Sequence, residues 1–181
     1  MALDILIVDD ETDICALCSG ILEDEGYQTR QSGGSDDALA SIESRRPSLV
    51  LLDIWLQGSE LDGLGILEVL KKDHPDVPVV MMSGHGTIET AVTAITMGAY
   101  DFIEKPFNAD RLLLVVERAL EASRLRRENV ELRLRAGAEE ELIGISPAIK
   151  LLRQAIDRVA STNSRVLVTG PAGSGKEGVA R

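Results

Sequence analysis

The sequence is poor in the residue types that mark several common kinds of site. Aromatic residues make up 3% of its 181 residues, and it contains two cysteines and two histidines. Cys15 and Cys18 have a C-x-x-C spacing, but no second Cys or His pair completes a zinc site. We therefore interpret them as small thiols packed at a contact between a helix and a sheet.

Long hydrophobic runs are also absent. Although 44% of the residues are hydrophobic, which is enough for a buried core, no apolar run approaches the length of a membrane span. Such a span needs about 18 residues. No basic segment followed by an apolar one marks a signal peptide. We expect a cytoplasmic protein without a membrane partner.

Basic residues are scarce in the first part of the chain. Residues 1–107 hold 6 Lys and Arg against 20 Asp and Glu, a net charge of −14. Residues 108–181 hold 13 against 10, a net charge of +3. Binding to nucleic-acid phosphates needs positive charge, so the first part is a poor DNA binder, and the second is only weakly basic. The asymmetry predicts two parts with different roles.

Short aliphatic runs alternate with helical patterns along the first part. Strand-like runs lie at residues 4–8, 27–31, 49–52, 79–82 and 100–104. Helical patterns lie at residues 11–25, 35–44, 64–72, 88–97 and from 109 onward. We expect Ser35 to cap the second helix. Because several strands are apolar throughout, the pattern predicts an α/β fold with a doubly wound parallel sheet covered on both faces.

Polar residues stand at the carboxyl ends of four of these strands, where ligands bind in such sheets. They are Asp9, Asp10, Asp53, Ser83 and Lys105. Clustered carboxylates without Cys or His suit Mg²⁺ or Mn²⁺. A divalent ion, an ammonium and a hydroxyl around one more carboxylate form a site for phosphate. Asp53 is the candidate nucleophile, because a carboxylate can form an acyl phosphate.

Four segments carry a resemblance to a known family. "VDDE" at the first strand end, "LVLLDIW", "VVMMSGHG" and "GAYDFIEKPF" resemble the response-regulator receiver domain of bacterial two-component systems, over about residues 1–120. The resemblance implies a five-stranded flavodoxin-like (CheY-like) sheet in the order 2-1-3-4-5. It also implies that Asp53 is the phosphoacceptor, taking a phosphoryl group from the phosphohistidine of a sensor histidine kinase in a phosphorelay.

The resemblance also assigns roles to the metal ligands. Asp10 and Asp53 would bind Mg²⁺ directly, together with the backbone carbonyl of Trp55. Asp9 would act mainly through a metal-bound water.

Further roles concern the phosphoryl group and the switch. Ser83 and Lys105 would hold phosphoryl oxygens, and Phe102 would be the aromatic residue whose rotamer follows Ser83. The bond between Lys105 and Pro106 would be cis. The surface formed by the fourth helix, fifth strand and fifth helix would then change the protein surface that it binds. The resemblance implies a homodimer that forms through this surface.

The sequence departs from the family pattern after the third strand. Gln57 stands where proline is usual, and Asp62 and Gly63 fall two residues late, so the loop is longer than typical. Trp55 is bulky for its position, but a backbone contact to a metal would survive. His85, two residues past the switch serine, is interpreted as a loop histidine.

Residues 109–134 continue a helical pattern rich in Arg and Glu, without Gly or Pro. The apolar residues can be assigned to either of two competing stripes along the helix. Two interpretations therefore stay open: a linker that pairs with the same helix of a second copy of the chain, and a helix surrounded by solvent. An amphipathic helix is expected at 149–159 and a β-type run at 165–169.

The segment "GPAGSGKE" fits a phosphate-binding loop, with Gly170, Gly175 and Lys176, and Gly173 between them. Glu177 replaces the usual Ser or Thr, so a plain glycine-rich turn is the alternative. Residues 142–181 nevertheless resemble the start of the AAA+ domain of bacterial enhancer-binding regulators of the NtrC/NtrX type, which act in nitrogen regulation. The predicted division is a receiver domain at 1–120, a helical linker at 121–141 and an AAA+ segment at 142–181.

No Walker B acid, arginine finger or helix-turn-helix follows, so we expect a fragment of a longer transcription factor that is not itself an enzyme. ATP, DNA and RNA polymerase would be bound only by the full-length protein. The leading hypothesis is a response regulator that controls transcription. The alternative is a Mg²⁺-dependent phosphohydrolase using Asp53, although such enzymes usually carry an acid where Trp55 stands. A third hypothesis, an ATPase, depends on Lys176.

Overall fold

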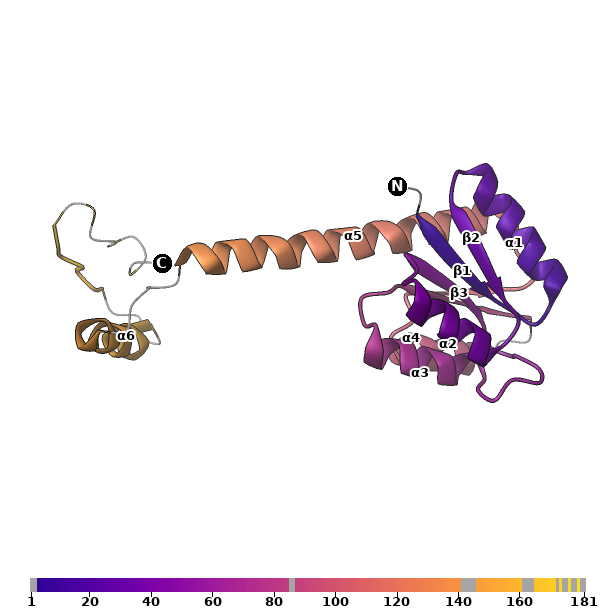
Figure 1. The fold of residues 1–181 in the computed structure, drawn as a ribbon, viewed down its shortest axis with the longest axis horizontal. Coiled ribbons are helices and arrows are strands. Elements are labelled where there is room, and N and C mark those ends of the chain that lie inside the picture. Colours follow the sequence, from indigo (N-terminus) through magenta and orange to yellow (C-terminus); the bar gives the residue numbers. More distant parts are fainter. Residues whose placement is uncertain are drawn as a thin grey trace. The chain divides into compact units, whose positions relative to one another are not determined.

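Five short parallel strands form one sheet in the order β2-β1-β3-β4-β5 (Figure 1). The strands are β1 (Asp4–Val8), β2 (Gln28–Ser32), β3 (Leu49–Asp53), β4 (Val79–Ser83) and β5 (Asp101–Glu104). The computed structural model describes residues 3–84, 87–140, 146–160 and 165–171, together with residues 173, 176 and 179. The parallel direction and the strand order confirm the predicted doubly wound fold.

Helices cover both faces of this sheet. They are α1 (Thr12–Asp24), α2 (Ser35–Ser44), α3 (Gly63–Asp73), α4 (Ile88–Thr96) and α5 (Ala109–Glu140), and α6 (Pro147–Ala160) follows. α2, α3 and α4 lie against one face, while α1 and the first turns of α5 lie against the other (Figure 1). Two apolar core clusters result, one on each side of the sheet.

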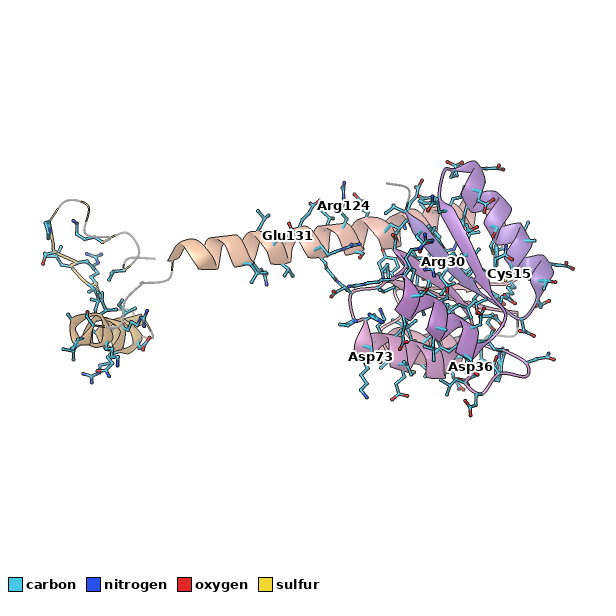
Figure 2. All side chains as sticks on the ribbon, viewed as in Figure 1. Cys15, Arg30, Asp36, Asp73, Arg124 and Glu131 are labelled. Atoms are coloured by element: carbon cyan, nitrogen blue, oxygen red, sulfur yellow. The ribbon has the colours of Figure 1, made fainter. Side chains whose placement is uncertain are left out.

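The strand sequences reflect their positions in the sheet. β1, β3 and β4 are buried along their whole lengths, which explains their uninterrupted apolar runs. β2 lies at the edge and is mostly polar. Its Arg30, labelled in Figure 2, pairs through Nη2 with Asp4 Oδ2 at 2.7 Å. Arg45 Nη2 lies 2.7 Å from the other oxygen of this buried carboxylate, which joins the amino end of the sheet to α2.

The expected cap at Ser35 is wrong. Gly34, which has no side chain, is the N-cap of α2. Ser35 is the first helical residue, and its hydroxyl oxygen accepts a hydrogen bond from the backbone N of Leu61 at 3.4 Å. The loop between β3 and α3 therefore uses the hydroxyl that the sequence pattern assigned to capping.

The β-type run at 165–169 is also wrong as a strand. Residues 165–171 have no regular secondary structure, and Leu167 is 87% exposed. A strand needs a neighbouring strand for its backbone hydrogen bonds, and the described residues of this region contain no such neighbour. The helix expected at 149–159 is confirmed as α6.

The chain divides into two compact units, Met1–Arg126 and Arg127–Arg181. Within the first unit, Cys15 and Cys18 are free thiols buried between α1 and the sheet, which confirms their interpretation as packing residues. Charged side chains of α5, such as Arg124 and Glu131, are exposed (Figure 2). Among the described residues, no helix combines the length and the apolar character needed to cross a membrane.

Candidate functional site

Three carboxylates meet where β1 and β3 end. Asp9 and Asp10 directly follow β1, and Asp53 is the last residue of β3. One oxygen from each of the three carboxylates can be chosen so that all lie within 4.8 Å of one another. The backbone N of Glu11 donates to Asp9 Oδ1 at 2.9 Å, which fixes the orientation of that side chain. The parallel sheet thus brings together the three acids that the sequence predicted.

Lys105 provides positive charge to this cluster. Its Nζ lies 2.6 Å from Asp9 Oδ2 and 3.1 Å from Asp53 Oδ1, and its side chain is 8% exposed. A third carboxylate oxygen, Oε1 of Glu11, lies 3.5 Å away. Burial alone would lower the pKa of Lys105, but the hydrogen bond to Asp9 and the charges of Asp53 and Asp9 outweigh it and raise the pKa.

The backbone places Lys105 beside the end of β4. Its N donates to the carbonyl of Ser83 at 2.8 Å, and the bond between Lys105 and Pro106 is cis. Ser83 is fully buried at the same edge of the sheet as Asp53. Phe102 pairs with Met81 in the sheet and is half-buried against the α2–α4 side of the core.

Asp53 is a buried acid whose two oxygens have different surroundings. Oδ2 accepts a hydrogen bond from the backbone N of Trp55 at 3.2 Å. Oδ1 has Lys105 as a charge partner at 3.1 Å, but accepts no well-aligned hydrogen bond within the described part of the chain. Burial raises the pKa of Asp53 to about 6, against a lowering by Lys105 and a further raising by the charge of Asp9. A buried anionic oxygen short of donors fits a site that receives a cation.

The loop between β3 and α3 is long, as the sequence indicated, and it is packed in place. Leu56 is buried in the core, and Gly58 has a positive φ of 74°. Ser59 Oγ accepts a hydrogen bond from the backbone N of Ser35 at 3.3 Å. At the far end of the loop, a Cβ on Gly63 would lie 2.0 Å from the carbonyl oxygen of Asp53, so only glycine fits there.

A cavity of about 690 Å³ opens beside the carboxylates. Trp55 lines it and is 57% exposed. Glu11 and Gln57 line it as well, next to Asp53 and Lys105. Sequence reasoning missed the contact of Glu11 with Lys105, because Glu11 stands at the start of a helix, where an acid needs no further explanation. It also missed the contacts between Ser35 and the loop.

The predicted phosphate-binding loop is described in part. Lys176 Nζ donates to the carbonyls of Gly170 and Pro171 at 2.9 and 2.6 Å, and Gly173 has a positive φ of 77°. The lysine thus lies against the backbone of its own loop. Gly175 lies outside the described residues, as does His85 in the first unit.

Comparison with protein families assigns both ends of the chain. Residues 5–117 match the response regulator receiver domain, and residues 142–181 match the sigma-54 interaction domain. The first match covers more than half of the chain and contains every residue of the carboxylate site. The chain therefore belongs to the response-regulator receiver family.

Within this family the chain is similar to NtrX proteins. It is 62% identical over 181 residues to the nitrogen assimilation regulatory protein NtrX of Azorhizobium caulinodans, covering 100% of this chain and 40% of the relative. A crystal structure of Brucella abortus NtrX in complex with ATP is 63% identical, with a TM-score of 0.72 over 99% of this chain and 39% of that one. The chain thus spans about 40% of the length of the curated relative.

Two structures of isolated receiver domains also match. The receiver domain of Brucella abortus NtrX is 68% identical, with a TM-score of 0.64, and covers 65% of this chain and 98% of that one. The beryllofluoride-activated receiver domain dimer of NtrC4 is 38% identical, with a TM-score of 0.63, and the match covers 66% of this chain and 98% of that one.

Proposed function

We propose that this protein is a phosphorelay response regulator in which Asp53 accepts a phosphoryl group from the phosphohistidine of a sensor histidine kinase. The observation that carries the proposal is the buried Asp53 carboxylate, with Lys105 Nζ 3.1 Å from its Oδ1 and the carboxylates of Asp9 and Asp10 beside it. The name of the Azorhizobium relative, a nitrogen assimilation regulatory protein, supports a role in nitrogen regulation, and control of transcription is the proposed output. The receiver part would be a regulatory phosphoacceptor and not an enzyme, and it would act in the cytoplasm, beside its kinase and its genes.

The donor set fits a hard divalent cation. Asp9, Asp10 and Asp53 offer only oxygen ligands, and the backbone carbonyl of Trp55 would complete the set. Mg²⁺ is the proposed ion, with Mn²⁺ as a substitute of similar chemistry. A bound Mg²⁺ would supply positive charge that offsets the phosphoryl oxygens.

The side chains would divide the remaining chemistry between them. Oδ1 of Asp53 would form the bond to phosphorus while the bond from phosphorus to the histidine nitrogen breaks and the nitrogen keeps the electron pair. Lys105, already between Asp9 and Asp53, would hold a phosphoryl oxygen of the product. The hydroxyl of Ser83 would donate to another phosphoryl oxygen.

The switch would act through the surface of α4, β5 and α5. Phe102 would change rotamer with Ser83, and this surface would then pair in a homodimer. Ile88, Val92 and Ile95 of α4 are exposed apolar side chains available for such pairing. The activated receiver dimer of NtrC4 supports the proposal by analogy. The helical linker at 121–141, between the receiver domain at 1–120 and the AAA+ segment at 142–181, is a second possible contact.

The AAA+ segment would bind ATP in the longer protein. Gly170, Gly173, Gly175 and Lys176 are the proposed phosphate contacts, and the ATP complex of Brucella abortus NtrX supports this role. DNA and RNA polymerase would be contacted by other parts of the longer protein.

Phosphorylation is tested by incubating the protein with Mg²⁺ and acetyl phosphate and recording the intact mass. We expect a single phosphoryl adduct on the wild type and none on Asp53→Asn. The matched control is Asp36→Asn, because Asp36, labelled in Figure 2, is an exposed acid on α2 that does not line the cavity beside Asp53. The absence of an adduct on the wild type, or an adduct on Asp53→Asn equal to that of the wild type, would contradict the proposal.

A further inference from the structure

A second cavity lies at the opposite edge of the sheet from Asp53. It has a volume of about 410 Å³ and is bounded by the end of α3, the segment before β4, the turn between α4 and β5, and α5. At this edge the backbone N of Tyr100 donates to the carbonyl of Val79 at 2.7 Å, which joins the amino ends of β4 and β5. Because the carboxylates stand at the carboxyl ends of the strands, the two cavities are separate sites.

Apolar residues form part of the lining of this second cavity. Val77, Ala99 and Ala119 line it and are buried, with exposed fractions of 2%, 7% and 0%. The ring of Tyr100 lies at its margin and is 37% exposed. A volume of this size suits a small molecule, for which typical sites measure about 300–1,000 Å³. Polar and apolar groups share the lining, which suits a compact group that has both a polar and an apolar part.

Lys71 brings a half-buried positive charge to this cavity. Its Nζ donates to the carbonyl of Val77 at 2.7 Å, and its stem packs on Gly98, where a Cβ would lie 3.3 Å from Lys71 Cγ. Among the described residues, no carboxylate lies within ion-pair distance of Lys71. Burial lowers the pKa of Lys71, and the charge of Arg126 lowers it further, while Asp76 opposes both. The ammonium is held in place without a neutralising partner.

Arg126 adds a second cation. It lines the cavity from α5 and is exposed, and no ion pair of Arg126 occurs in the described part of the chain. Asp76 is the acid at the margin, but its Oδ2 already pairs with Arg46 Nη2 at 3.3 Å. Lys71 and Arg126 both line this cavity, and the charge of Arg126 lowers the pKa of Lys71, so the two cations repel each other.

We propose that this cavity binds a small organic carboxylate, with the carboxylate between Lys71 and Arg126 and an apolar body against Val77, Ala99 and Tyr100. The bound anion would offset the repulsion between the two cations, and the ammonium protons of Lys71 that Val77 does not use would donate to it. The site is independent of phosphoryl transfer, because it shares no lining residue with the cavity beside Asp53.

The competing explanation is structural, with Lys71 serving only to satisfy the Val77 carbonyl. The two explanations are separated by titrating the whole chain with benzoate and recording backbone amide shifts. We expect saturable shifts of Val77, Gly98 and Tyr100. Benzamide has the same shape without charge, and it should bind at least about fivefold more weakly if the cations hold the anion.

Variants locate the binding. Lys71→Met and Arg126→Gln should each weaken benzoate binding by about fivefold. Lys72→Gln is the matched control, because Lys72 is the exposed neighbour on α3 and does not line the cavity. Arg126 is exposed, so its substitution tests the proposal even where Lys71→Met fails to fold. No saturable shift, equal binding of benzamide, shifts only near Asp53, or an equal effect of Lys72→Gln would each overturn the proposal.

Discussion

At the scale of the residue, Asp53 is an acid held under opposing electrostatic influences. Its side chain is 6% exposed, and burial raises its pKa to about 6 although Lys105 lowers it. The raised pKa means that the folded protein binds a proton at Asp53 more tightly than the unfolded chain does. The ionised carboxylate therefore lowers the free energy of unfolding at neutral pH in the absence of metal.

The pH dependence of stability follows from this sign. Ionised Asp53 lowers the free energy of unfolding by its full amount above the folded-state pKa of about 6. This destabilisation disappears as the pH falls toward 3.8, the ordinary pKa of an aspartate side chain. With EDTA present, we expect Asp53→Asn to raise the free energy of unfolding by about 1–3 kcal/mol at pH 8 and by little at pH 4. Urea unfolding at the two pH values measures the difference. Asp36→Asn serves as the control, and a larger gain at pH 4 than at pH 8 would contradict this account.

At the scale of the element, the loop between β3 and α3 fixes the surroundings of Asp53. The backbone N of Gly63 donates to the carbonyl of Ile54 at 2.9 Å, so the loop closes against the residue that follows β3. Ser59 and Leu61 tie the same loop to Ser35 at the start of α2. The loop is longer than the family pattern, yet it is anchored to the core and to a helix.

Gly63→Ala tests this closure. The added Cβ would lie 2.0 Å from the carbonyl oxygen of Asp53, which cannot move without displacing β3. We expect a loss of at least about 3 kcal/mol in the free energy of unfolding, measured by urea denaturation, and a weaker adduct with acetyl phosphate. Gly20→Ala in α1 is the matched control. Its Cβ meets nothing within 4 Å, so we expect a gain of about 0.5–1 kcal/mol there. Equal effects of the two variants would refute the role of Gly63.

These elements also show what could be predicted from the sequence. The aliphatic runs predicted the strands, and the polar residues after them predicted the acids and Lys105 of the site, because parallel strands end at one edge. The cap at Ser35 could not be predicted, since Leu61, 26 residues away, takes the same hydroxyl. The cavity beside Lys71 was missed for a similar reason. Its walls come from four segments, and no local sequence pattern indicates that they meet.

At the scale of the whole molecule, the uneven charge corresponds to two units with different family matches. The acidic receiver match ends at residue 117, and the sigma-54 interaction match begins at residue 142. α5 begins in the receiver match and continues to Glu140. Leu125, Val130, Leu132 and Leu134 on this helix are all more than half exposed. They leave open both interpretations of the linker, a pairing surface and a solvated helix.

Association on activation is the prediction at this scale. With Mg²⁺ and beryllofluoride, a mimic of the phosphoryl group, we expect light scattering to report a mass near twice that of the 19.5 kDa chain. Val92→Asp on α4 should reduce this association at least about tenfold, because a charge would be buried in the pairing surface. Leu17→Asp on α1 is the control, since the two side chains have similar exposed fractions of 50% and 59%. A dimer retained by Val92→Asp but lost by Leu17→Asp would place the contact on the other face.

Trp55 gives the protein an optical property of practical value. It is the single tryptophan of the sequence, it stands two residues after Asp53, and its half-exposed indole lines the cavity beside Asp53. Its emission therefore arises from one place in the molecule, and charges arriving at that cavity will change it. We expect the intrinsic fluorescence at 295 nm excitation, a wavelength selective for indole, to change on titration with Mg²⁺ and again with acetyl phosphate. Asp53→Asn should lose the second change, so the chain carries its own label for following its activation in real time.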